Sequence, residues 1–208
     1  MAQAQTLPGA GTVPATQEAA VTKPAAVAVA NPAPLGLAGF AMTTLILSLV
    51  NTGIVTGSSL AVVVALAMAY GGLGQLIAGW WEFRNGNTFG AVAFSSYGAF
   101  WWSYAAFVVL FHGKDAGTAV SWYLLAWGIF TFYMWVASLK GARPVMIVFL
   151  LLWITFVVLA LGGFNNALPG TGLTQLGGYV GLLTAIAAFY TSARGVINES
   201  WGSEVLPG

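Results

Sequence analysis

Residues 144–162 read PVMIVFLLLWITFVVLALG, and this stretch decides the fold class. It contains no charged residue, and Thr155 is its only side chain with a hydroxyl. A helix needs about 20 mostly apolar residues to cross the hydrocarbon core of a bilayer. A strand of a membrane barrel would instead alternate apolar and polar residues over about ten positions. The stretch therefore predicts a transmembrane helix.

The composition of the whole chain agrees with a membrane protein. Of its 208 residues, 59% are hydrophobic and 5% are charged, with a net charge of +1, one His and no Cys. Soluble domains carry about 25% charged residues. The near-neutral charge argues against a nucleic-acid partner, and the lack of Cys with a single His argues against a metal site. Because no catalytic or phosphate-binding motif is present, we expect no enzyme activity and no cofactor.

Five further apolar stretches predict five more spans, so the fold class is an all-α polytopic membrane protein with six transmembrane helices. The six predicted spans are Leu35–Asn51, Ser58–Phe83, Thr88–Phe111, Thr118–Leu139, Pro144–Gly162 and Gly172–Ala193. We place the transmembrane domain at residues 31–195. Residues 1–30, rich in Ala, Thr, Pro and Val, are expected to form a flexible tail, and residues 196–208 a C-terminal tail.

The basic residues predict the orientation of the spans. With a cytoplasmic N-terminus, five of them fall on the inside and Lys114 alone falls outside. Cytoplasmic loops carry an excess of Lys and Arg. We therefore expect a multi-pass protein of the plasma (inner) membrane with both termini in the cytoplasm.

A weak repeat accompanies this pattern. Each even-numbered span ends on a basic residue with a Gly close behind, at Arg84, Lys140 and Arg194. Internal repeats are typical of transporter folds, so three two-helix hairpins are one interpretation. The orientation rule alone would also place a basic residue after each of these spans, and the sequence leaves both interpretations open.

Neutral polar residues, rather than charges, lie inside the predicted spans. No Asp, Glu or His is mid-span, and the nearest is Glu82, two residues before Arg84 at the expected cytoplasmic mouth. This pattern favours a channel-like path, or a substrate that carries its own proton. Hydroxyls and amides can replace part of the hydration shell of a small polar solute. The candidates for such a path are Thr43, Thr44, Asn51, Gln75, Ser96 and Thr131.

A signature run precedes the first span. It reads Asn31-Pro32-Ala33-Pro34-Leu35-Gly36-Leu37. The backbone of a residue before proline is extended, Asn31 can cap free N–H groups, and Pro34 suits a first helical turn. The sequence therefore predicts a rigid start to the first helix, whose N–H groups could attract an anion.

Together with Gly39-Phe40-Ala41-Met42-Thr43-Thr44 and Gly86-Asn87-Thr88-Phe89-Gly90, the signature resembles the acetate uptake transporter family, which includes the bacterial succinate–acetate permeases. The likeness runs from Asn31 to the C-terminus. It implies a protomer of urea-channel-like architecture in a homo-hexamer, with one path for acetate and related short carboxylates through each protomer. It also implies an apolar constriction, formed here by Phe40, Tyr97 and Leu152.

Two alternatives to acetate transport are weighed. A urea or short-amide channel would share the architecture, but the signature run belongs to the carboxylate family. A membrane protein that transports nothing is disfavoured by the deep band of hydroxyl groups. Whether the proton moves with the substrate, and whether succinate or lactate is carried, is left open by the sequence.

Overall fold

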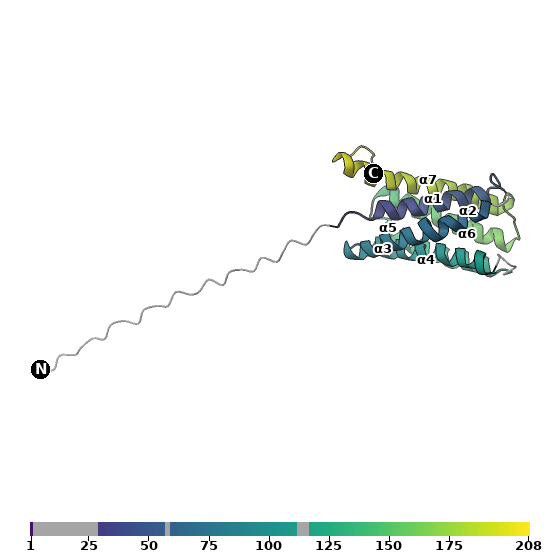
Figure 1. Ribbon diagram of the computed structural model, residues 1–208, viewed down its shortest axis with the longest axis horizontal. Helices are drawn as coiled ribbons and strands as arrows, with labels where there is room; N and C mark the ends of the chain where they lie inside the picture. The colour runs from purple at the N-terminus through teal and green to yellow at the C-terminus, as the bar shows by residue number, and fades with distance from the viewer. Residues whose placement is uncertain (2–28, 57–58, 112–116) are drawn as a thin grey trace.

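The computed structural model describes residues 1, 29–56, 59–111 and 117–208, and within these ranges the chain is helical and contains no strand. The helices are α1 (Ala33–Asn51), α2 (Ser59–Met68), the π-helix η1 (Ala69–Gly74), α3 (Gln75–Arg84), α4 (Thr88–Phe111), α5 (Ala119–Ser138), α6 (Arg143–Phe164) and α7 (Gly172–Trp201). They lie along one common direction in a bundle (Figure 1).

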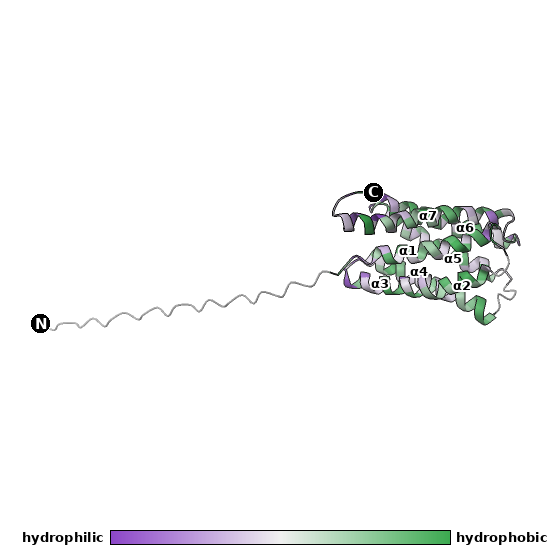
Figure 2. Ribbon diagram, turned by 45° about the horizontal axis from the view of Figure 1, so that its top comes forward, coloured by the Kyte–Doolittle hydropathy of each residue, from purple (hydrophilic) through white to green (hydrophobic). Residues whose placement is uncertain are grey.

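Six of these segments are long and apolar enough to cross a membrane, with α2, η1 and α3 forming one continuous span, Ser59–Arg84. The prediction of six transmembrane helices is confirmed. Hydrophobic colour runs along most of each helix in Figure 2, and hydrophilic colour gathers near the ends of α3 and α7. Many large apolar side chains, such as Trp80, Ile129 and Leu183, face outward, as lipid contact requires.

Most boundaries lie within two residues of the prediction, and Thr88–Phe111 agrees at both ends. The last helix differs most, because α7 continues to Trp201 instead of ending at Ala193. The beginning of the predicted C-terminal tail is therefore helical. The predicted N-terminal tail lies almost wholly outside the described residues, as do Lys23 and Lys114, on which the orientation argument also drew.

The first and last spans pack closely together, and the helices follow one another around a ring that is loose between α4 and α5. α1 packs along α7, α7 along α6, and α6 along α5, while α3 and η1 pack on α1 and α4. The backbones of α4 and α5 stay apart, and large aromatic side chains such as Tyr97, Phe100 and Trp127 fill the space between them. The repeat suggests three two-helix hairpins, and the hairpin of the third and fourth spans, α4 and α5, is therefore the least closely packed of them.

The π-helix η1 is a feature that the apolar pattern of the second span did not reveal. Its sequence is AYGGLG, and Trp102 of α4 donates an indole hydrogen bond to the carbonyl of Met68, just before it, at 2.9 Å. Short π segments within α-helices are frequent at functional sites. Here the segment leads directly into Gln75, the first residue of α3.

The signature run joins the start of α1 to the end of α7. Asn31 Oδ1 accepts a hydrogen bond from Ala33 N at 3.0 Å, but the residue at the N-cap position is Pro32. Ala33 precedes a proline, yet it is helical rather than extended, because it is the first residue of α1. Ser192 donates to the carbonyl of Pro34 at 2.7 Å. A Cβ on Gly36 would lie 2.5 Å from the ring of Phe94, so this position admits only glycine without a shift. We call this end of the bundle the signature end.

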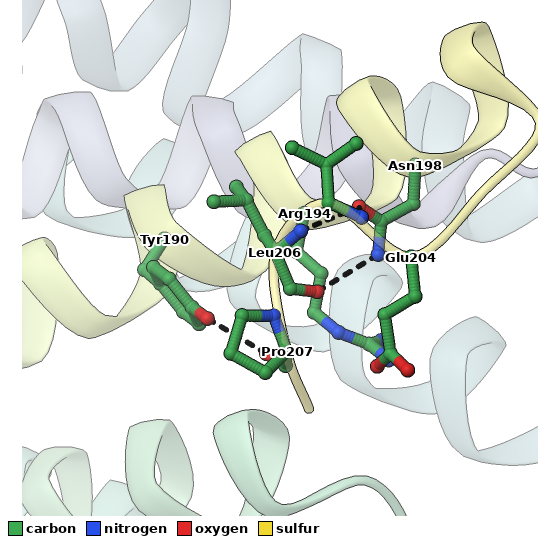
Figure 3. A network of polar contacts seen from close by, with 7 residues as sticks. Tyr190, Arg194, Asn198, Glu204, Leu206 and Pro207 are labelled. Carbon is green, nitrogen blue, oxygen red and sulfur yellow. Dashed lines mark hydrogen bonds and ion pairs between the residues drawn. The ribbon is translucent and has the colours of Figure 1, made fainter.

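The chain folds back on itself after α7 at the signature end (Figure 3). Gly202 adopts a left-handed conformation with φ of 63°, which reverses the chain direction. Asn198 then binds Val205 N and Leu206 N through its Oδ1, and Tyr190 donates to the carbonyl of Pro207. Arg194 and Glu204 make an ion pair at 3.3 Å, which completes the attachment.

Candidate substrate path

Two cavities lie inside the bundle, one behind the other. The Glu82 cavity, of about 490 Å³, reaches Ala33, Asn87 and Lys140 at the signature end. The Thr44 cavity, of about 460 Å³, reaches Asn51 and Thr174 at the opposite end. Phe40 and Leu152 line both cavities, and no other residue that the structure describes does. These two side chains therefore stand at the boundary between the cavities.

Tyr97 lies beside this boundary. Its ring centroid is 5.9 Å from that of Phe40 and 6.1 Å from that of Phe149, and it lines the Glu82 cavity. The hydroxyl is held 2.9 Å from Thr131 Oγ1, which in turn donates to the carbonyl of Trp127. With its polar group satisfied on α5, the ring offers apolar surface toward Phe40. The structure thus places Phe40, Tyr97 and Leu152 together in the lining of the Glu82 cavity.

The polar candidates fall into three groups. Thr44 and Asn51 line the Thr44 cavity, and Gln75 lines the Glu82 cavity. Thr131 supports Tyr97 without lining either cavity. Thr43 donates to the carbonyl of Gly39 at 2.9 Å, and Ser96 is half-buried, and both lie outside the two linings.

The end of α3 departs from the expectation drawn from the sequence. Glu82 was expected near the interface, but its side chain is fully buried and lines a cavity. Arg84 is exposed and lies outside the cavity lining, where Lys140 is the basic residue instead. The sequence shows that Glu82 lies near the end of its helix, which is why an interfacial position was expected. Its side chain is buried because it lies on the face of α3 that points into the bundle.

Several buried polar atoms have no hydrogen-bond partner among the described residues. In the Thr44 cavity these are Thr44 Oγ1 and the indole nitrogen of Trp101. Trp101 was not among the path residues predicted from the sequence. In the Glu82 cavity they are Gln75 Oε1 and both carboxyl oxygens of Glu82. Buried polar groups are normally paired, so these atoms call for water or a polar solute. The described residues hold no cluster of His, Cys, Asp or Glu that could bind a metal.

Helices that span a membrane, with two internal cavities in line and a narrow apolar boundary between them, define a membrane transport protein of the all-α class. The chain belongs to the GPR1/FUN34/yaaH family, whose model matches residues 14–206.

Relatives of known name cover nearly the same region. The succinate-acetate/proton symporter SatP of Escherichia coli strain K12 is 40% identical over 183 residues, which are 86% of this chain and 95% of that protein. Acetate permease A of Emericella nidulans is 38% identical over 196 residues, 86% of this chain and 65% of the relative. The solved structure of the bacterial acetate channel SatP matches with a TM-score of 0.80 at 38% identity, covering 86% of this chain and 98% of the other.

Proposed function

We propose that the protein transports acetate and related short-chain carboxylates across a membrane, through a path within each protomer. The observation that carries this proposal is the pair of cavities that meet at Phe40 and Leu152. The relatives named as acetate transporters and the likeness to the SatP channel supply the substrate class. On this proposal the chain acts as a transporter and not as an enzyme.

The boundary acts as a filter for size and charge. Hydrophobic constrictions exclude water and ions by dewetting, while the polar groups of each cavity compensate part of the lost hydration. A carboxylate must therefore leave most of its water before it passes Phe40, Tyr97 and Leu152. Small, weakly hydrated forms of the substrate pass most easily.

A urea or short-amide channel of the same architecture is the alternative. No feature of the two cavities favours an amide over a carboxylate, and the named relatives do not point to urea. Uptake of labelled acetate and of labelled urea into proteoliposomes separates the two. The pH is set to about 6, where part of the acetate is still protonated, because free carboxyls titrate near pH 4 to 5. Urea uptake without acetate uptake would overturn the proposal.

Replacing Leu152 by Val or Ala should admit larger monocarboxylates such as lactate. Leu152 is buried, and its side chain borders both cavities, so shortening it widens the boundary on one side. A hydrophobic pocket discriminates one methylene by about 1–3 kcal/mol, so we expect lactate to gain about tenfold or more relative to acetate. Competition of lactate with labelled acetate measures the gain.

Leu161→Ala is the matched control, because Leu161 lies on the same helix, is 46% exposed and lines neither cavity. The control should leave the preference unchanged. Unaltered competition by lactate in a folded Leu152→Ala variant would show that Leu152 does not limit the path.

We propose that the protein lies in the plasma (inner) membrane and that its signature end faces the cytoplasm. Arg84, Lys140, Arg143 and Arg194 support it, since basic residues concentrate on that side. The chain has no Cys, so single-cysteine variants carry one reactive site each. Asn166→Cys should react with an impermeant reagent from outside the cell and Ser203→Cys should not. Labelling of Ser203→Cys from outside would reverse the topology. The homo-hexamer stays a prediction.

A further inference from the structure

A buried carboxyl group with no hydrogen-bond partner among the described residues lies in the Glu82 cavity. The side chain of Glu82 is 0% exposed, and within the described part of the chain neither of its carboxyl oxygens has a hydrogen-bond or ion-pair partner. The side chains of Asn85 and Asn87 approach the carboxyl, but neither makes a hydrogen bond of good geometry to it. An ionised carboxylate buried in this way is costly unless a donor or a proton reaches it.

The structure makes room for this group. A Cβ on Gly90 of α4 would lie 2.7 Å from both Cδ and Oε1 of Glu82, so the carboxyl occupies the space that a larger residue would fill. Gln75 lies about two turns earlier on the same helix, lines the same cavity and also has an unpaired acceptor oxygen. Among the described residues, the unpaired atoms of this cavity are thus all oxygens, and they can only accept hydrogen bonds when Glu82 is ionised.

The charged and titratable surroundings of Glu82 are few. Lys140, from the link between α5 and α6, lines the same cavity, and Tyr97 lines it from α4. The residues that α1 and α6 contribute to this lining are uncharged, and Arg84 on α3 is exposed outside it. Among the described residues, Lys140 is thus the only fixed positive charge in the lining. It lies at the signature end of the cavity, where it attracts a carboxylate anion that enters or leaves.

We propose that Glu82 is the group that binds the transported proton, which rests on the proposed function in carboxylate transport. A carboxylic acid that enters the Glu82 cavity donates its O–H to a carboxylate oxygen of Glu82. The O–H bond of the acid breaks, its electron pair stays on the acetate, and a new O–H bond forms on Glu82. Acetate then leaves past Lys140, and Glu82 releases its proton to water at the signature end.

The test separates net transport from exchange. A group that must take up and release a proton is needed for net uptake driven by a pH gradient, but exchange of labelled for unlabelled acetate at equal pH leaves the proton count unchanged. In proteoliposomes, Glu82→Gln should lower gradient-driven uptake by about tenfold or more, as loss of an acid–base group does. Exchange should stay within about twofold of the wild type, because Gln keeps the size of the side chain.

Two further variants frame the result. Glu82→Asp keeps a carboxyl and should restore part of the gradient-driven uptake. Glu199→Gln makes the same chemical change at an exposed position of α7 that lines neither cavity, and should behave as the wild type. Thermal unfolding of each variant shows that it is folded.

The other outcomes overturn the proposal in distinguishable ways. Undiminished gradient-driven uptake in Glu82→Gln would mean that the acid gives its proton directly to water. Equal loss of uptake and exchange, also in Glu82→Asp, would mean that Glu82 only shapes the cavity. A wild-type protein that exchanges no acetate at all would instead refute the proposed function.

Discussion

Acetate flux through the wild-type protein should fall about hundredfold between about pH 5.5 and about pH 7.5 at constant total acetate, because only the neutral acid passes the boundary readily. Free carboxyls titrate near pH 4 to 5, so above that range the neutral fraction drops about tenfold per pH unit. Moving a bare anion past Phe40, Tyr97 and Leu152 would cost several kcal/mol in lost hydration, a cost that the neutral acid largely avoids. The hydroxyl of Thr44, which is unpaired, can both donate to and accept from a carboxyl group.

The measurement is acetate flux across this pH range with the membrane voltage clamped. At a fixed concentration of neutral acetic acid the flux should stay nearly constant while total acetate varies. Flux that follows total acetate and carries current would make the protein an anion channel, and the neutral-acid mechanism would then be wrong. The Glu82 proposal concerns the later fate of the proton and is tested separately by its own variants.

Replacing Tyr97 by Ala should change selectivity strongly without unfolding the protein. The substitution removes the ring that packs against Phe40 and Phe149 and leaves space at the boundary. Widening an apolar constriction weakens dewetting, so larger acids and ions pass more easily. Because one methylene is worth about 1–3 kcal/mol in such a pocket, lactate and succinate should gain at least about tenfold relative to acetate.

Two controls belong with this variant. Tyr97→Phe keeps the ring and loses only the hydrogen bond to Thr131, so its selectivity should stay close to the wild type. Tyr179→Ala removes a ring that is 47% exposed on α7 and lines neither cavity, and it should change nothing in transport. Unaltered acetate, lactate and succinate rates in a folded Tyr97→Ala protein would refute the role of Tyr97 at the boundary.

The sequence predicted the number and order of the spans well, because a lipid environment demands long uncharged helices. It missed the extension of α7 to Trp201, since residues 194–201 are too polar for a bilayer and continue the helix beyond it. It also missed η1, because a π segment changes the hydrogen bonding of the backbone and leaves hydropathy unchanged. The run Gly71-Gly72 with Gly74 was the available signal for it.

The three constriction residues were chosen from the family resemblance and from their mid-span positions. Phe40, Tyr97 and Leu152 were expected to form the constriction; all three line the Glu82 cavity, and Phe40 and Leu152 also line the Thr44 cavity. The direction of a side chain around its helix was harder, because apolar residues surround these spans on all sides and no polar stripe marks the inner face. For this reason Thr43 and Ser96 were selected although they line neither cavity, and Trp101 and Lys140 were overlooked.

The π-helix fixes the rotational phase of α3. Val63, Ala67, Gly71 and Gln75 are all buried at intervals of four, a spacing that drifts around a regular helix with 3.6 residues per turn. The wider turns of η1 offset this rotation. Val63 is therefore buried in the bundle, and Gln75 and Glu82 further along the same span still line the cavity. Deleting one residue between positions 69 and 74 would rotate the following helix by about 100°. The second span thus consists of two α-helical segments, α2 and α3, that η1 rotates relative to each other about the helix axis. This rotation determines which side chains of α3 face the cavity.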